Sequence, residues 1–173
     1  MKKISMENVA RFEKVSFKEF KNACESCMSP FDVGEDEIKA MYDQIRLPSR
    51  ATEGSAGYDF YLPIMVKLDG KTCRMIPTGI RCKIKNGWML MCCPKSGLGF
   101  KYRMQLANTV GIIDSDYYLS DNEGHIMAKL SCEREFSMNA GDKFMQGIFI
   151  PYGIVKGDST NGIRNGGFGS TGR

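Results

Sequence analysis

The sequence predicts an all-β domain with a short helical extension in front of it and a glycine-rich arm behind it. Helix signals are confined to residues 1–46, whereas residues 47–152 consist of short apolar or alternating runs punctuated by Gly and Pro. Residues 153–173 hold seven of the 19 glycines and no convincing element. We expect 173 residues to bury one core rather than two.

Two helices are expected in the extension. Ser16 and Glu19 have the spacing of a capping box, which opens a helix that runs to about Ser26. A second helix begins near Glu35, and its apolar face is formed by Ile38, Met41, Tyr42 and Ile45. These apolar stripes favour packing on the flank of the β-domain, and a surface for a partner protein is the alternative.

The strands are expected in six short runs, 58–66, 72–76, 79–84, 88–93, 125–132 and 143–151. Between them lie Gly, Pro and other turn residues, and no helical period of useful length survives. Several short strands at this spacing predict a sandwich or barrel of the jelly-roll kind.

The composition argues against two classes of function, membrane proteins and nucleic-acid-binding proteins. The longest apolar run, 88–93, is far too short to span a membrane, and the net charge of +4 is too weak to indicate a nucleic-acid surface. Seven irregularly spaced cysteines indicate reduced thiols, and with no signal-peptide pattern we expect a cytoplasmic location. The pair Cys24 and Cys27 would need two more ligands to hold structural zinc, so buried small side chains are the preferred interpretation.

The arm has the composition of a phosphate-binding loop. Its glycines expose backbone N–H groups, to which Ser170 and Thr171 add hydroxyls and Arg164 adds charge. Phe168 lies among glycines, where an aromatic ring can stack on a nucleobase. A flexible linker is the alternative interpretation.

Four internal segments have a similar character. Residues 51–59 form a small-residue loop that ends in Asp59, and residues 94–99 follow the most apolar strand with a cation, a hydroxyl and two glycines. Residues 108–117 place an amide, two acids and a tyrosine around a short apolar strand, and residues 141–146 form a turn before another strand. Each alone is typical of a turn. The Walker A and Rossmann glycine motifs are absent.

Together and in this order, the five segments resemble the five motifs of the trimeric dUTPases (dUTP diphosphatases), over roughly residues 46–173. The resemblance implies a dUTPase-like jelly roll or distorted β-barrel that forms a homotrimer with active sites between subunits. It also implies Mg²⁺-dependent hydrolysis of dUTP to dUMP and pyrophosphate by water attack on the α-phosphate. This activity limits uracil in DNA and supplies dUMP for dTMP synthesis. No membrane or direct nucleic-acid binding is expected.

The resemblance also implies residue roles. Asp114 would be the base that deprotonates the attacking water, Gln146 would support the network of phosphate and water, and Asp59 would hold waters of the Mg²⁺ ion. Uracil and sugar would be bound by Asn108, Gly111, Tyr117 and the covering ring of Phe168. The phosphates would be bound by Lys95, Ser96, Gly97, Arg164, Gly169, Ser170 and Thr171.

Three features depart from the family pattern. Lys95 stands where arginine is more usual, and lysine cannot make the forked two-bond contact. The segment after Tyr117 is longer than the usual short turn, which makes Tyr118 a rival for the sugar site. Arg164 lies one residue closer to Phe168 than usual.

Two other functions compete. A dCTP deaminase shares this fold and would need an acid near the base, for which Glu123 is the candidate. A regulatory nucleotide-binding protein could instead act on partners through residues 1–46.

Overall fold

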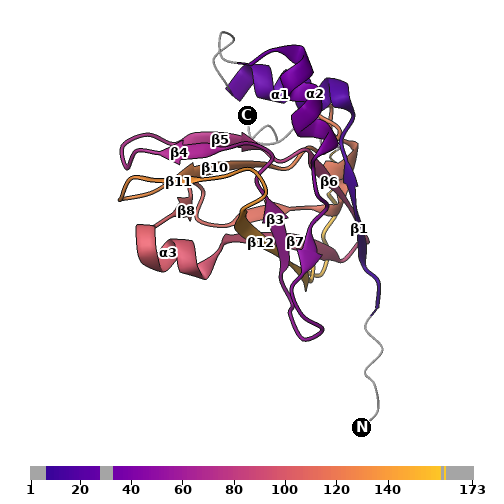
Figure 1. The fold of residues 1–173 in the computed structure, drawn as a ribbon. Coiled ribbons are helices and arrows are strands. Elements are labelled where there is room, and N and C mark those ends of the chain that lie inside the picture. The colour runs from indigo at the N-terminus through magenta and orange to yellow at the C-terminus, as the bar shows by residue number, and fades with distance from the viewer. Residues whose placement is uncertain (1–6, 28–32, 161, 163–173) are drawn as a thin grey trace.

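The computed structural model describes residues 7–27, 33–160 and 162. Its strands are β1 (Ala10–Lys14), β2 (Ser49–Arg50), β3 (Tyr58–Tyr61), β4 (Val66–Leu68), β5 (Arg74–Pro77), β6 (Ile80–Ile84), β7 (Trp88–Pro94), β8 (Gln105–Leu106), β9 (Gly111–Ile113), β10 (Met127–Ser131), β11 (Phe136–Met138) and β12 (Lys143–Pro151). Its helices are α1 (Phe17–Cys27), α2 (Glu35–Asp43), α3 (Ser96–Tyr102) and the 3-10 helix η1 (Ser115–Leu119). The all-β fold expected from the sequence is confirmed (Figure 1).

The largest sheet is built around β12. Its order is β2-β3-β12-β7-β9, and the nine residues of β12 pair with β3 on one side and β7 on the other. The pairing with β3 shifts register between Lys143 and Met145, as a β-bulge does. Smaller sheets, β5-β10-β8, β11-β4 and β1-β6, flank this centre (Figure 1). Side chains from all of them share one core, in which Phe60, Leu90, Leu130 and Phe144 are fully or almost fully buried.

The extension contains the two expected helices and also a strand, β1, that the sequence interpretation missed. The Oγ atom of Ser16 accepts a hydrogen bond of 3.1 Å from the N–H of Glu19, so the expected cap of α1 is present. All five residues of β1 pair with β6. Phe12 in β1 lies 5.4–5.7 Å, centroid to centroid, from three rings of the β-domain, Tyr58, Phe60 and Phe149. The extension is therefore part of the body of the fold.

Both helices pack on the flank of the β-domain. Phe20 of α1, Ile38 of α2 and Ile45 beyond it belong to the common core. Gly79, just before β6, has a positive φ of +70°, and a Cβ there would lie 2.2 Å from Cδ1 of Ile45. Only glycine permits this close approach. No helix in the described part of the chain is long and apolar enough to cross a membrane.

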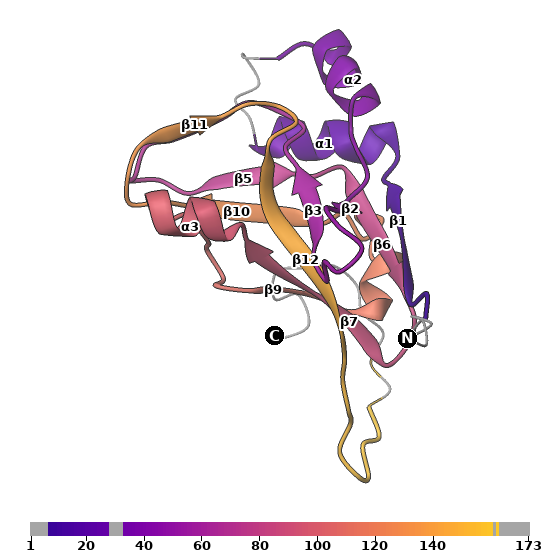
Figure 2. The same cartoon turned by 60° about the horizontal axis from the view of Figure 1, so that its bottom comes forward.

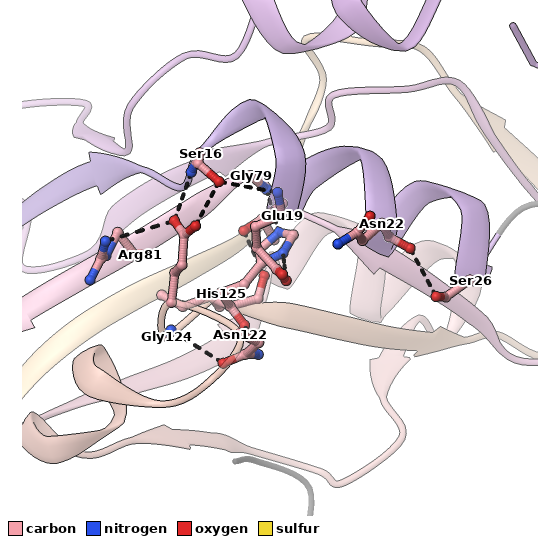
Figure 3. A network of polar contacts seen from close by, with 12 residues as sticks. Ser16, Glu19, Asn22, Ser26, Gly79, Arg81, Asn122, Gly124 and His125 are labelled. Carbon is pink, nitrogen blue, oxygen red and sulfur yellow. Dashed lines mark hydrogen bonds and ion pairs between the residues drawn. The ribbon is translucent and has the colours of Figure 1, made fainter. Parts of the chain in front are cut away.

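The only histidine, His125, is fully buried where α1 meets the β-domain (Figure 3). Its Nε2 accepts a hydrogen bond of 2.8 Å from the N–H of Gly79. The proton therefore lies on Nδ1, which faces Oε1 of Glu19 at 3.2 Å. Burial lowers the pKa of His125 to about 4, although the nearby Glu123 carboxylate acts in the opposite direction. His125 is neutral at physiological pH.

We expect His125 to make the fold acid-sensitive between pH 6.5 and 4. Its pKa is lower in the folded chain than in the unfolded chain, so the unfolded chain binds the extra proton as the pH falls through this window. The loss at the acid end is about 3 kcal/mol. Thermal unfolding at fixed protein concentration, followed from pH 7 to 4.5, measures it.

The matched variant is His125→Gln, which can accept from Gly79 and donate to Glu19 at every pH. Its unfolding temperature should fall less steeply than that of the wild type, while Glu19 and Glu123 contribute to both. Equal slopes would contradict the assignment of a neutral, buried His125.

Candidate functional site

The double pairing of β12 gathers three of the five sequence motifs at one end of the large sheet. Gln146 lies opposite Asp59 of β3 and opposite Cys93 of β7. Lys95 follows β7 directly, and its N–H donates to the carbonyl of Phe144, 3.1 Å away. A Cβ on Gly57 would lie 2.6 Å from Oε1 of Gln146, so the small-residue loop makes room for the glutamine.

Asp59 is buried between two lysines. Its side chain is 3% exposed, and its Oδ1 and Oδ2 accept hydrogen bonds from the Nζ atoms of Lys95 at 2.6 Å and Lys143 at 2.8 Å. Burial alone would raise the pKa of Asp59, but the bonds and charges of Lys143 and Lys95 outweigh it and hold the pKa below its ordinary value. Asp59 is therefore a buried anion that fixes two cations. The sequence interpretation gave Lys143 no role, although it begins β12 within a quoted motif.

An exposed loop lies next to these lysines. Ser96 and Gly97 form the first turn of α3, and both are exposed. Nothing lies within 4 Å of a Cβ built on Gly97, so a ligand can approach the backbone there. The carbonyl of Lys95 accepts two 3.0 Å bonds, from Leu98 and Gly99, which hold the turn in place. A hydroxyl, an open backbone and fixed cations suit an anionic group.

A second part of the site is the hairpin between β8 and β9. Thr109 has a φ of +67°, and its N–H donates to the carbonyl of Leu106 at 2.8 Å, which closes a tight turn. Beside the turn is a cavity of about 230 Å³, and Asn108 is the one amide residue among the described residues that line it. The other lining residues are mostly apolar, and they include Met75, Cys92, Leu106, Gly111, Ile113 and Met145. An apolar slot with an amide at its edge suits a flat, polar-edged ring.

Asp114 lies at the opposite end of β7 from Lys95. Ile113 pairs with Leu90, so Asp114, which directly precedes η1, lies about six strand residues from Lys95, or roughly 20 Å. Figure 2 shows α3 at one end of β7, while the chain that leaves β9 runs to the other. Asp114 instead faces an open hollow of about 970 Å³ that Tyr152 and Thr160, beyond β12, also line. One chain therefore does not bring Asp114 and Lys95 together.

Tyr117 is 6% exposed, and its hydroxyl donates to the carbonyl of His125 at 2.9 Å. The longer segment after it returns at Gly124, where a Cβ would lie 2.7 Å from the carbonyl oxygen of Tyr117. The rival, Tyr118, donates instead to Oε2 of Glu13 in β1 at 2.7 Å. The role of Tyr117 at a sugar stays a prediction.

Of the remaining predicted residues, Glu123 has a structural partner, and those of the arm fall outside the described part of the chain. Glu123, the acid that a deaminase would need, binds Ser16 of the extension through both carboxylate oxygens. The arm residues Arg164, Phe168, Gly169, Ser170 and Thr171 lie outside the described residues.

In the part of the chain that the structure describes, the donor set does not fit a metal held by protein ligands alone. Both oxygens of Asp59 are bound to lysines, and no group of three His, Cys, Asp or Glu within the described ranges could hold an ion. Cys24 of the CxxC pair is a buried free thiol, and burial is the main cause that raises its pKa to about 12. The structure supports the interpretation of Cys24 as a packed small side chain.

The protein is an all-β domain with two neighbouring features of a ligand site. The lysines at Asp59 and the open turn at Ser96 suit negatively charged groups, and the apolar cavity beside the hairpin suits a flat ring. A protein-family model described as dUTPase matches residues 43–173. The chain belongs to the dUTPase family.

Individual relatives of the chain support the same family assignment. The deoxyuridine 5'-triphosphate nucleotidohydrolase of Lactococcus lactis is 37% identical over 133 residues, which are 74% of this chain and 89% of that protein. The protein of the same name from Legionella pneumophila is 36% identical over 143 residues, 76% of this chain and 90% of its own. The solved dUTPase of Streptococcus mutans is 31% identical and superposes with a TM-score of 0.58, covering 64% of this chain and 89% of its own.

A phage protein shares the fold over more of the chain. The dUTPase from phage phi11 of S. aureus superposes with a TM-score of 0.60 over 90% of this chain and 98% of its own. At 16% identity this likeness shows the fold alone.

Replacing Lys143 with Met should destabilise the fold. Asp59 would keep one cation instead of two, and a hydrogen bond to a charged group contributes about 1–3 kcal/mol. Lys143→Arg keeps the charge and is the control. Chemical unfolding at pH 7.5 measures both variants. If Lys143→Met were as stable as Lys143→Arg, the ion pair seen in the structure would not stabilise Asp59.

Proposed function

We propose that this chain hydrolyses dUTP to dUMP and pyrophosphate, with water attacking the α-phosphorus. The observation that carries this proposal is the pair of lysines that a buried Asp59 fixes beside the open turn at Ser96 and Gly97. A triphosphate is the ligand such a turn suits, and membership of the dUTPase family names the nucleotide. In a cell the activity would limit uracil in DNA and supply dUMP for dTMP synthesis.

The base would enter the cavity beside the hairpin. Asn108 would hydrogen-bond the edge of uracil together with backbone groups of the turn. A Cβ on Gly111 would lie 3.2 Å from the Cβ of Cys92, so glycine keeps the hairpin close to β7. Tyr117 would lie under the deoxyribose and leave no room for a 2′-hydroxyl.

The triphosphate would lie on the turn of α3. Lys95 would neutralise phosphate charge, and Ser96 and Gly97 would donate hydrogen bonds. Gln146, between β3 and β7, would orient phosphate and water. Mg²⁺ would enter bound to the phosphate oxygens of the substrate, and Asp59, whose two oxygens each accept from a lysine, would hold waters of the ion rather than the ion itself.

Asp114 would be the general base, and the geometry favours a site shared between subunits, which a homotrimer would supply. Lys95 and Asp114 lie roughly 20 Å apart along β7, too far to act on one α-phosphorus from the same chain. A site at a subunit interface would combine the phosphate turn of one chain with Asp114 of another. The arm, through Arg164, Phe168, Gly169, Ser170 and Thr171, would cover the nucleotide.

Pyrophosphate release across the eight common nucleoside triphosphates tests the function. We expect dUTP to be the preferred substrate by about 10⁴-fold over dCTP, because a mispaired base leaves buried polar groups without partners. Ammonia release from dCTP would identify a deaminase instead. Comparable pyrophosphate release from dCTP or dTTP would overturn the proposed uracil site.

Asp114→Asn should lower kcat by about 10²–10⁴-fold while dUTP still binds. The control is Asp121→Asn, which removes an exposed carboxylate from the segment after η1. If Asp114→Asn keeps more than about a tenth of wild-type kcat, Asp114 is not the general base.

Mixed trimers test the interface. A chain without residues 159–173 and the Asp114→Asn chain should each be inactive, and co-refolding should restore activity at sites that combine an intact arm with an intact Asp114. Native mass spectrometry confirms that hetero-trimers form. Hetero-trimers without a gain in activity would mean that base and arm come from one chain.

A further inference from the structure

A polar network joins the extension to the segment after η1 (Figure 3). The N–H and Oγ of Ser16, at the start of α1, donate to Oε2 and Oε1 of Glu123 at 2.8 and 2.6 Å. In a capping box the N–H of Ser16 would be bound by Glu19. Here Glu123, 107 residues away in sequence, takes that place, and Glu19 faces His125 instead.

The other side of the same segment holds Tyr117. The Nδ2 atom of Asn122 donates to the Tyr117 hydroxyl at 2.8 Å, and that hydroxyl donates to the carbonyl of His125. The Oδ1 atom of Asn122 accepts from the N–H of Gly124 at 3.2 Å, which keeps the turn tight. Residues 122–125 therefore contact the extension through Glu123 and His125, and the buried tyrosine through Asn122 and His125.

Arg81 of β6 also belongs to this network, and it contacts both η1 and Glu123. Its Nη2 donates to the carbonyl of Tyr118 at 2.9 Å, and its guanidinium lies 3.7 Å from the centroid of the Tyr118 ring. Its Nη1 lies 3.8 Å from Oε2 of Glu123. The negative charge of Glu123 thus lies between the donors of Ser16 and the cation that holds η1.

The partner of Glu123 lies in an unmatched part of the chain. The dUTPase family model begins at residue 43, whereas Ser16 and all of α1 precede it. Burial would raise the pKa of Glu123, but the bonds from Ser16 outweigh this and lower the pKa, so the carboxylate is charged at neutral pH.

We propose that Glu123 is a positioning residue that ties residues 120–125 to Ser16 and so fixes the Tyr117 ring at the substrate's sugar. The extension thereby contributes to discrimination between dUTP and UTP. This inference rests on the proposed function, because it assigns Tyr117 to the deoxyribose.

The test is Glu123→Gln, which keeps the size of the side chain but replaces the anion that accepts from both donors of Ser16 with a neutral amide that has one acceptor oxygen. We expect KM for dUTP to rise and the ratio of kcat/KM for dUTP over UTP to fall, each about tenfold, as displaced binding groups do. The kcat for dUTP should change less than about twofold. A purely structural role would lower the unfolding temperature and the active fraction but leave KM and the ratio unchanged.

Three variants act as controls. Glu7→Gln removes an ion pair between the extension and Lys85 that does not involve residues 120–125, and it should leave KM and the ratio unchanged. Ser16→Thr keeps the hydroxyl and should behave as wild type. Ser16→Ala should shift KM in the same direction as Glu123→Gln, and the double variant should show less than the product of the two effects.

Hydrogen exchange gives a readout that needs no activity. In Glu123→Gln, amides of residues 115–125 should exchange faster than in wild type, and in Glu7→Gln they should not. Unchanged exchange and an unchanged KM and ratio in Glu123→Gln would overturn the inference. A wild-type chain that fails to hydrolyse dUTP would overturn the proposed function instead, whatever the exchange rates show.

Discussion

The pairing of β12 on both sides is the constraint on which the site depends. A strand that pairs with two neighbours cannot slip by one residue without turning its side chains to the opposite face on both. This register sets Gln146 between Asp59 and Cys93 and brings the end of β7 to the same place. The bulge at Lys143 lets one strand serve both partners while a lysine still reaches Asp59.

The buried charge of Asp59 is costly by itself, and the two lysines offset that cost. An unpaired buried carboxylate is unfavourable, whereas one that accepts two charge-assisted bonds is held in its ionised form. The result is a fixed pair of cations beside an open turn before any ligand arrives. Preorganised charge of this kind stabilises developing negative charge without rearrangement during the reaction.

The fold class and the family could be predicted from the sequence. The capping box at Ser16 predicted α1, the apolar periodicity predicted α2, and the five motifs predicted the family. Strand β1 was missed because its five residues take their structure from the free edge of β6 and from rings that pack on Phe12. Such contacts between distant residues leave no local pattern.

The details of the site depended on tertiary contacts. Lys143 was missed because only the folded sheet brings it to Asp59. In sequence, Glu123 was the candidate for the acid that a dCTP deaminase needs near the nucleobase. In the structure its carboxylate binds Ser16 instead. The extra residues after Tyr117, a departure from the family pattern in sequence, form the turn that links the extension to η1.

In the site proposed here, the phosphate turn of one subunit and Asp114 of another would direct water to the α-phosphorus of dUTP. Hydrolysis in ¹⁸O-labelled water, with both products analysed by mass spectrometry, shows which phosphorus the water attacks. We expect one labelled oxygen in dUMP and none in pyrophosphate. Label in pyrophosphate would mean that water attacks the β-phosphorus and would contradict the proposed site.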